Sequence, residues 1–293
     1  MAVYVAVAEE ESFAAGARRL GMSPPAVTRA VAALEKRLGI KLLTRTTRFV
    51  RATDAGRRYL EHARRIIADA DEADEAAAGV NAAPRGQLSI TAPVIFGRVY
   101  VVPVVVDYLR NFPEVTVAAV LLDRVVNLLE EGIDVGIRIG ELPDSTLHAI
   151  RVGQVRRVVC AAPSYLRAHH VPRAPADLAR HTIINARPVT ASDDWKFTAG
   201  KKTLSVKVRP RLTVTNNEAA IVAAVQGFGV TRLLSYQAAP HVAAGELKII
   251  LADYEPASLP IHVVHSEGRQ ASAKVRTLVD LLVARLRGDK ALN

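Results

Sequence analysis

The chain has 293 residues, of which 50% are hydrophobic and 23% charged, and its formal net charge at pH 7 is +10. This length and composition fit a globular protein with a sizeable core, and the excess of cations favours an anionic partner. The lack of any run of about 18 consecutive apolar residues excludes a membrane-spanning helix, and the single cysteine excludes an internal disulfide framework.

Residues 12–38 have the pattern of two short helices joined by a tight turn. Ser12 is a suitable N-cap for the first helix, whose apolar residues recur at helical spacing. The second helix is expected to begin at Ser23, with Pro24 and Pro25 in its first turn, where missing N–H groups have no cost. Its buried stripe is expected to comprise Val27, Val31, Leu34 and Leu38.

The opposite face of this second helix has the character of a DNA-reading surface. A helix in the major groove needs small residues for close approach and donors that reach base edges, so Arg29 is a candidate for guanine and Thr28 for a base or a phosphate. Taken alone, the segment also fits an ordinary solvated surface helix. The DNA-contacting set on the helix is expected to comprise Ser23, Pro24, Pro25, Thr28, Arg29 and Lys36.

Residues 41–51 alternate in the manner of a short hairpin with cations along it. Between residues 17 and 67 there are 13 Lys and Arg against three acidic residues, so duplex DNA is the matching counter-charge. Two helices, a turn and a basic hairpin together predict a winged helix-turn-helix. The hairpin residues expected to contact phosphate or the minor groove are Arg45, Thr46, Arg48 and Arg51.

Residues 54–78 predict one long helix that follows Thr53 as its N-cap. At about 1.5 Å per residue it would be roughly 37 Å long, and its small and apolar residues step by four and three like a heptad seam. We expect this seam to pair with a second copy of the chain, the alternative being a helix packed only on its own body. The seam residues are Tyr59, Ala63, Ile66, Ala70, Ala73 and Ala77.

Glycine and proline between residues 79 and 86 mark a hinge, after which strand-like and helical runs alternate as in an α/β fold. The expected strands are 88–91, 115–122, 135–139, 158–162 and 261–265. The expected helices are 103–111, 124–131, 218–226 and 272–286.

Several phrases of the sequence together resemble the LysR-type transcriptional regulators. They are SPPAVTRAVAALEKRLGIKLLTRTTR and TDAG in the first part, then APVIFGR, LLEEGIDVGIRIGELPDS and AAVQGFGV. The resemblance covers nearly the whole chain, although Met1 lies closer to the first helix than is usual in the family. It implies a winged helix-turn-helix over 1–53, a linker helix and hinge over 54–83, and an effector-binding domain over 84–293.

The resemblance implies that the second domain has the periplasmic-binding-protein architecture, with two α/β subdomains and a ligand cleft between them. Subdomain I is expected at about 87–160 and 265–293 and subdomain II at about 161–264, with chain crossings near 160–164 and 258–265. Ligands bind beyond the carboxyl ends of such strands, and exposed N–H groups at helix starts favour a carboxylate or similar small organic anion as effector. The basic charge of the second domain fits an anionic effector or has no functional meaning. The family's effector contacts fall near Pro93, Val94, Arg138, Asn216, Asn217 and Thr231.

Each of these six positions also has a local explanation, and Pro93 also fits a residue that only fixes a turn. Pro93 stands where many family members have Ser or Thr, and it removes a hydroxyl and an N–H donor from the cleft. Arg138 also fits a structural ion pair, and the two asparagines also fit caps of the following helix.

An enzyme is the competing class, and the sequence lacks its chemistry. Cys160 lies in a Val-rich strand and is expected to be a small buried residue rather than a nucleophile. The histidine spacings suit no metal site, and neither a phosphate-binding glycine loop nor a GxSxG elbow is present, so we expect no catalytic residue, metal or cofactor. A solute-binding protein for transport is disfavoured because Glu9 and its acidic neighbours interrupt any export signal.

The sequence therefore predicts a cytoplasmic, sequence-specific DNA-binding regulator whose promoter binding and bending respond to a small-molecule effector. A constitutive regulator with a non-functional cleft is the alternative. The expected partners are double-stranded promoter DNA and further copies of the chain, a dimer through the linker helix and by resemblance a tetramer, with RNA polymerase as a further candidate and no membrane.

Overall fold

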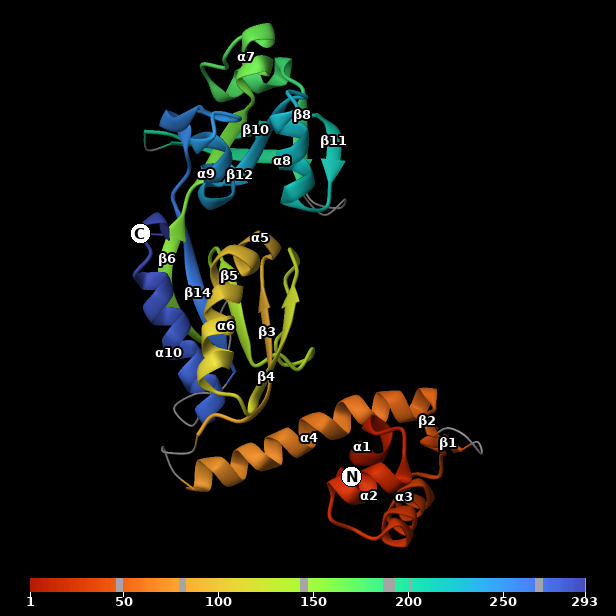
Figure 1. The fold of residues 1–293 in the computed structure, drawn as a ribbon. Helices are drawn as coiled ribbons and strands as arrows, with labels where there is room; N and C mark the ends of the chain where they lie inside the picture. The colour runs from red at the N-terminus through yellow and green to blue at the C-terminus, as the bar shows by residue number, and fades with distance from the viewer. Residues whose placement is uncertain are drawn as a thin grey trace. The chain divides into compact units, whose positions relative to one another are not determined.

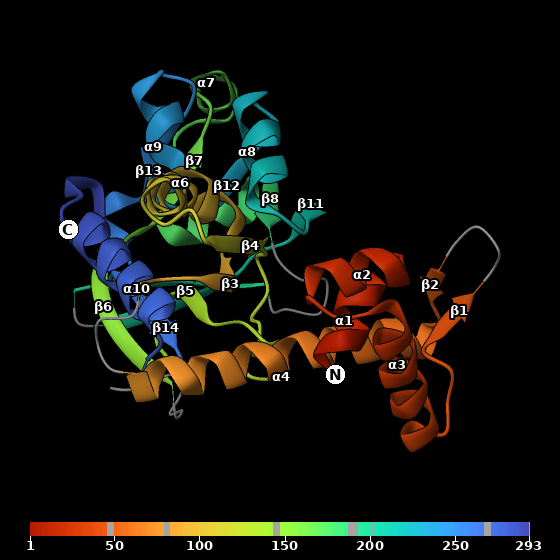
Figure 2. The same ribbon diagram turned by 60° about the horizontal axis from the view of Figure 1, so that its bottom comes forward.

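The structure is a computed structural model that describes residues 1–45, 50–78, 83–142, 147–186, 193–200, 202–266 and 271–292, with the backbone alone for 45, 65, 68, 69 and 71–78. It divides into two compact units, Met1–Gln87 and Leu88–Asn293. Figures 1 and 2 show their elements from two directions.

The first unit is a small helical body with a two-stranded wing and one long helix. The antiparallel wing pairs Leu43 with Ala52 and Arg45 with Val50. The elements are α1 (Ala2–Glu9), α2 (Phe13–Arg19), α3 (Pro24–Leu38), β1 (Leu43–Arg45), β2 (Val50–Ala52) and α4 (Asp54–Ala78).

Local capping explains where these helices begin and end. Ser12 Oγ accepts a hydrogen bond from the Ala15 amide at 3.3 Å, as expected of an N-cap. Ser23 occupies the N-cap of α3, but its side chain makes no cap hydrogen bond. Gly39 ends α3 at φ 68°, a left-handed conformation that glycine adopts without strain. The apolar stripe of α3 is buried as expected, with Val27, Val31 and Leu34 in the core and Leu38 packed against it.

The second unit contains two five-stranded sheets, each covered by helices. The first sheet has the order β4-β3-β5-β14-β6. Its strands are β3 (Gly86–Ala92), β4 (Val115–Leu121), β5 (Val135–Ile139), β6 (His148–Val155) and β14 (Leu259–His265). Its helical segments are α5 (Val94–Phe96), a π-helical turn over Gly97–Val101, α6 (Val102–Asn111), α10 (Ala273–Arg287) and a short turn at Lys290–Leu292.

The second sheet has the order β11-β8-β12-β7-β13 and carries a separate hairpin of β9 and β10. Its strands are β7 (Arg157–Ala161), β8 (Ile183–Ala186), β11 (Pro210–Val214), β12 (Val230–Leu234) and β13 (Lys248–Ile250), and the hairpin strands are β9 (Asp194–Ala199) and β10 (Lys202–Lys207). The helices are α7 (Pro163–His169), α8 (Asn217–Val225) and α9 (Ser235–Ala243), with 3₁₀ turns at Pro175–Arg180 and Ala252–Tyr254. This two-sheet α/β arrangement is the fold class expected from the sequence.

The first crossing of the chain between the two sheets lies earlier in the sequence than expected. Cys160, predicted to lie at the crossing, is inside β7 of the second sheet, and the crossing is at Arg156, between β6 and β7. The second crossing lies between β13 and β14, so all of β14 belongs to the first sheet. The sheet membership therefore places the subdomain borders near residues 156 and 258 rather than 160 and 265.

The predicted helix over 124–131 is wrong. Asn127 Oδ1 accepts hydrogen bonds from the amides of Leu129 and Glu130, an arrangement that competes with helical bonding. The segment forms isolated turns instead. Its buried residues, Val126 and Leu128, are two positions apart rather than at helical spacing, and Val125 is 88% exposed.

The helix predicted over 103–111 begins earlier, because Val94 starts a continuous helical run that contains a π-helical turn before α6. Pro103 lies at the start of α6 and has no N–H to donate, and a missing donor of this kind favours a local change in the helical hydrogen-bond pattern.

Candidate DNA-binding surface and ligand cleft

The outer face of α3 has the exposure that a reading helix needs. Arg29 and Lys36 are exposed and Thr28 is half-buried, whereas Val27 on the inner side is 0% exposed. Within the described residues Arg29 forms no ion pair, so its guanidinium is available to an outside acceptor. Ser23, Pro24 and Pro25 are exposed at the start of the same helix.

The wing is described in part. Arg51 is exposed on β2, and the backbone of Arg45 pairs with Val50 across the hairpin. Thr46 and Arg48 lie outside the described residues.

Glu35 joins α3 to the start of the wing, a role that the sequence did not reveal. Its side chain is 8% exposed, and it accepts hydrogen bonds from the amides of Leu42 and Leu43 at 2.9 and 3.1 Å and from Lys41 Nζ at 2.7 Å. Burial raises the pKa of Glu35, but the hydrogen bonds from Lys41, Leu43 and Leu42 outweigh it, so the net pKa is lowered. A buried carboxylate therefore holds the wing against α3.

The TDAG segment, residues 53–56, packs the start of α4 against the same helical body. Thr53 Oγ1 accepts from the Gly56 amide at 2.9 Å, which confirms the expected N-cap of α4. Gly56 lies so close to the wing that a Cβ would stand 2.1 Å from the Leu42 carbonyl oxygen, and the Tyr4 hydroxyl donates to its carbonyl at 2.9 Å. Glycine is required here by close approach of two backbones.

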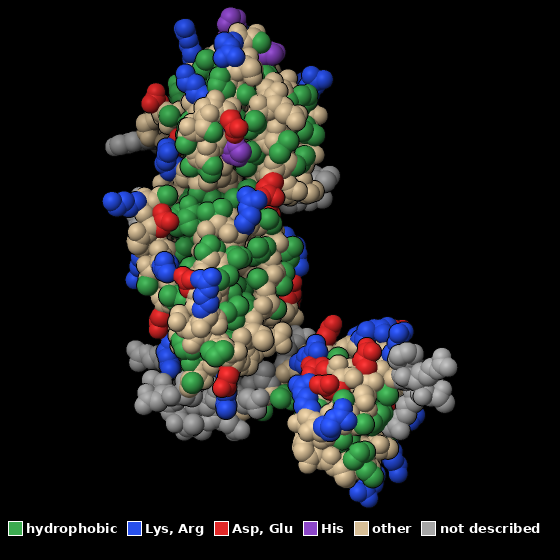
Figure 3. Space-filling model, in the orientation of Figure 1, with side chains coloured by type: hydrophobic (Ala, Val, Ile, Leu, Met, Phe, Trp, Pro, Cys, Tyr) green, Lys and Arg blue, Asp and Glu red, His purple; other side chains and the backbone are tan. Residues whose placement is uncertain are grey.

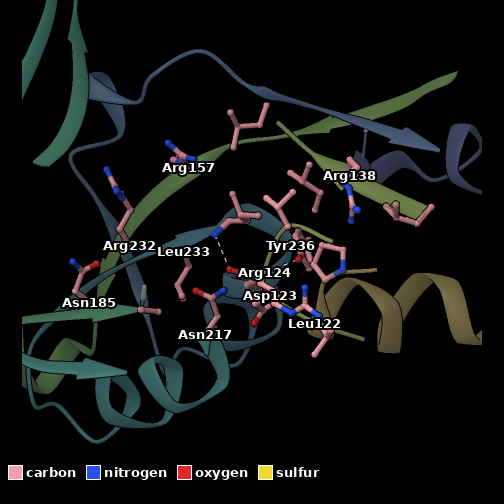
Figure 4. A pocket seen from close by; sticks show the side chains of 18 residues that line it. Leu122, Asp123, Arg124, Arg138, Arg157, Asn185, Asn217, Arg232, Leu233 and Tyr236 are labelled. Atoms are coloured by element: carbon pink, nitrogen blue, oxygen red, sulfur yellow. Dashed lines mark hydrogen bonds between the residues drawn. The ribbon is translucent and has the colours of Figure 1, made fainter. Parts of the chain in front are cut away.

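A cleft of about 320 Å³ lies where the two sheets of the second unit meet. Figure 4 shows side chains from both sheets pointing into it. Its charged and polar lining residues are Asp123, Arg124, Arg138, Arg157, Asn185, Asn217, Arg232, Tyr236 and Gln237, and its other lining residues are Pro93, Leu122, Val125, Ile137, Ile139, Ala186, Leu233, Leu234 and Leu259.

Three of the six predicted effector contacts line this cleft, namely Pro93, Arg138 and Asn217. Thr231 is 0% exposed on the other face of β12 from Arg232, and Asn216 caps α8 by accepting from the Ala219 amide at 2.8 Å. The Val94 amide donates to Asp123 Oδ1 at 3.0 Å. The structure thus brings together half of the predicted set.

The cleft arginines differ in how they are compensated. Arg124 makes a bidentate pair with Glu131 at 2.9 and 2.8 Å. Arg138 donates to the Val126 carbonyl oxygen and forms no ion pair with a described residue, so the expected structural ion pair is replaced by a backbone contact. Burial lowers the pKa values of Arg138 and Arg157.

Sequence reasoning placed Arg232 in a loop near the cleft but missed three other residues that the second sheet and α9 bring to it: Arg157, Asn185 and Tyr236. A signal was present, because Arg157 and Arg232 are the charged residues of the otherwise apolar strands RVVCA and VTRLL. A charge inside a buried strand is unusual and points to a specific environment.

Tyr236 also links the two lobes of this unit. Its ring lies 5.4 Å from that of Phe96 and 5.9 Å from that of Tyr100, both in edge-to-face geometry. Phe96 and Tyr100 belong to the first lobe and Tyr236 to the second, so one aromatic cluster beside the cleft spans both.

Cys160 is fully buried, and burial raises the pKa of its thiol to about 12, as suits a packing residue. Within the described part of the chain, no helix is long and apolar enough to cross a membrane, and no three His, Cys, Asp or Glu residues form a group that could hold a metal ion.

A winged helix-turn-helix joined to a two-lobed α/β domain with a cleft defines a DNA-binding transcriptional regulator with an effector-binding domain. Family models bear this out: one for the LysR substrate binding domain matches residues 81–287, and one for the bacterial regulatory helix-turn-helix protein of the lysR family matches residues 1–57. The chain belongs to the LysR family of transcriptional regulators, which are not enzymes.

Curated relatives agree along the whole chain. An HTH-type transcriptional regulator of Xanthomonas campestris pv. campestris is 34% identical over 292 residues, which are 98% of this chain and 85% of that protein. The HTH-type transcriptional activator TtdR of Escherichia coli is 32% identical over 288 residues, 96% of this chain and 91% of that one. The solved structure of CrgA, a LysR-type transcriptional regulator from Neisseria meningitidis, has 28% identity and a TM-score of 0.64 and covers 98% of this chain and 97% of its own.

Proposed function

We propose that this regulator binds a promoter site of two-fold symmetry through α3 and the wing, and that a small organic anion in the cleft adjusts DNA binding and bending. The arginine lining of the cleft carries the proposal. Four arginines line it against one carboxylate, Asp123, and a cavity of this charge attracts and orients an anion.

On the DNA side, we assign base reading to Arg29 and Thr28. Ser23, Pro24, Pro25 and Lys36 contact the sugar-phosphate backbone or allow its close approach, and Arg45, Thr46, Arg48 and Arg51 hold phosphate or the minor groove. The exposure of Arg29 and Lys36 on the outer face of α3 supports this assignment.

For the cleft, we assign ligand contact to Pro93, Arg138 and Asn217, the three predicted positions that lie on its wall. Of the other three, Val94, Asn216 and Thr231, none lines the cleft, and we assign them no direct contact. A ligand that favours one arrangement of the two lobes changes how the DNA-binding units are presented. The Phe96, Tyr100 and Tyr236 cluster spans both lobes, and Tyr236 lines the cleft, so such a change would have to rearrange this cluster.

Assembly is part of the same proposal. Two half-sites require two copies of the chain, paired through α4 and joined further into a tetramer. On the face shown in Figure 3, hydrophobic side chains gather over α6 and the preceding π-helical turn, where Val99, Val102 and Val106 are 47%, 36% and 40% exposed. These valines supply an apolar surface for the further contact. The protein would act in the cytoplasm, where promoter DNA and RNA polymerase, its further candidate partner, are found.

The function is tested by footprinting the full-length protein on its own upstream DNA with and without small aliphatic and aromatic acids. A ligand at a concentration of about 100 times its Kd stabilises the native state by about 2.7 kcal/mol, so the melting temperature should rise by roughly 5–10 °C. An acid that raises the melting temperature and alters the footprint supports the proposal. If the footprint forms but no acid changes it or the melt, the constitutive regulator is the correct function.

A further inference from the structure

Two arginines share one face of the central strands of the second sheet, at the edge that borders the cleft. Arg232 of β12 is paired with Val159 of β7, and Leu234 is paired with Arg157. Paired residues share a face and so do residues two apart along a strand, so Arg157 and Arg232 are diagonal neighbours on one face. Figure 4 shows them side by side on one wall of the cleft.

No carboxylate among the described residues compensates this pair. Within the described part of the chain neither Arg157 nor Arg232 makes an ion pair, whereas Arg124 on the facing wall is neutralised by Glu131. Burial, and after it the charge of Arg157, lowers the pKa of Arg232 to about 10, so Arg232 still carries its proton at pH 7. Two half-buried like charges at diagonal positions on one sheet face are unfavourable unless something pairs with them.

The surroundings hold the pair in place. The Arg232 Cζ lies 4.9 Å from the centroid of the Trp195 ring, and Trp195 is 0% exposed, so the guanidinium rests on a rigid surface. Asn185 follows the position in β8 that pairs with Thr231, and therefore lies on the same face as Arg232 and adds an amide to the same wall. The rest of the lining beside them includes Leu233, Leu234 and Leu259, which suit a short carbon skeleton.

We propose that Arg157 and Arg232, with Asn185, form a dianion subsite, and that the effector is a small organic molecule whose acidic groups together carry two negative charges there. The inference rests on the proposed function and narrows its ligand class. Each guanidinium offers a planar pair of donors that matches a carboxylate or phosphate, and two such groups balance two charges. Dicarboxylates and phosphomonoesters share this chemistry, and a cleft of about 320 Å³ limits either to a small molecule.

The chain carries its own reporter, because Trp195 under Arg232 is its only tryptophan. Full-length protein is titrated with matched pairs of acids, succinate against butyrate and glycerol phosphate against glycerate, and Trp195 fluorescence is recorded. We expect the dianion of at least one pair to bind at least about tenfold more tightly than its monoanion. The pair that shows this preference tells a dicarboxylate ligand from a phosphomonoester.

Arg157→Gln is the test variant. It should weaken dianion binding at least about tenfold. It should also reduce the preference for dianion over monoanion, because a single negative charge is enough to pair with the one remaining arginine. The ligand-free variant should melt at or above the temperature of the unchanged protein, since it relieves an unpaired like-charge contact. Arg167→Gln removes an equal charge from the exposed surface of α7 in the same lobe and should leave both affinities unchanged.

The outcomes separate this inference from the function on which it rests. If an acid alters the footprint but no dianion binds more tightly than its matched monoanion, the dianion subsite is overturned and effector binding stands. The same conclusion follows if the dianion binds Arg157→Gln as tightly as it binds the unchanged protein. A ligand-free Arg157→Gln protein that melts well below the unchanged one assigns the arginines a structural role and also overturns it. If no acid of either charge binds, the proposed effector response itself fails.

Discussion

Arg29 is the side chain to which we assign base reading, because it is an exposed cation in the middle of α3. Replacing Arg29 with Ala should cost about 1–3 kcal/mol of specific binding and relax the preference at one base pair. Competition binding over a randomised operator library measures both. Equal weakening on every sequence would show that Arg29 touches phosphate alone.

Lys36 lies two turns further along the same face and provides the contrast. As a phosphate contact, Lys36→Ala should weaken binding on all sequences alike and reduce the slope of log K against log salt by about one. The slope is obtained by repeating the binding measurement over a salt series. An unchanged slope would remove Lys36 from the contact surface.

Glu35 is the residue whose loss should loosen the wing. Glu35→Gln exchanges a buried carboxylate that accepts three hydrogen bonds for a neutral amide, at a cost of about 1.5–3 kcal/mol. Hydrogen exchange of the peptide containing Leu42 and Leu43 measures this loss locally, and faster exchange is expected in the variant. Unchanged exchange would contradict the anchoring role.

The same carboxylate makes the wing sensitive to acid. The folded-state pKa of Glu35 is lowered, so the unfolded state binds more protons at acid pH. Its contribution is therefore complete above the unfolded pKa of about 4.3 and is lost as the pH falls through the folded value. The exchange difference between the unchanged protein and Glu35→Gln should shrink below about pH 4.

At the scale of elements, the first turns of α4 and the turns that follow them differ in how far their side chains are buried. Its first turns pack on their own body, since Ala63 is 0% exposed and Tyr59 lies 5.5 Å from the Tyr4 ring in edge-to-face geometry. Further along, Ile66 is 52% exposed and Ala70 is exposed, while the side chains of Ala73 and Ala77 lie outside the description. The first part of the seam therefore packs on its own body, and pairing with a second copy stays a prediction for the exposed part.

Ile66 is the position at which pairing through α4 is tested. Ile66→Glu should lower the mass seen by mass photometry at nanomolar concentration, because two buried carboxylates would face each other across a dimer. Val171→Glu is the matched control, with 47% exposure against 52% for Ile66. A mass distribution identical in both variants would mean that α4 does not pair.

At the scale of the second unit, Tyr236 couples the two lobes. Tyr236→Ala removes a 6% exposed ring from the contact with Phe96 and Tyr100 and should cost about 3–5 kcal/mol, with the calorimetric transition broadening or splitting as the lobes lose cooperativity. Tyr236→Phe keeps the ring and should cost roughly 1 kcal/mol. One sharp transition at the original temperature in Tyr236→Ala would exclude the coupling.

Much of the architecture was predictable because its signals are local. The caps and stripe of α3, the bounds of α4 and the strand over 135–139 follow from residues within one or two turns of each other. The predicted helix over 124–131 failed for a local reason too, since the Asn127 side chain takes the amides that a helix would use.

The sequence by itself determined the class of the protein, a DNA-binding winged unit followed by an α/β effector domain. Helical and strand periodicity, helix caps and runs of charge all depend on residues close together in the sequence, so a single sequence is enough to recognise them. Only the tertiary structure decided which charges of the cleft are paired. Arg124 has Glu131, whereas Arg157 and Arg232 meet each other through the register of β7 and β12. The free energy of these charged side chains depends on their burial and on partners far away along the chain, and a local sequence pattern contains neither.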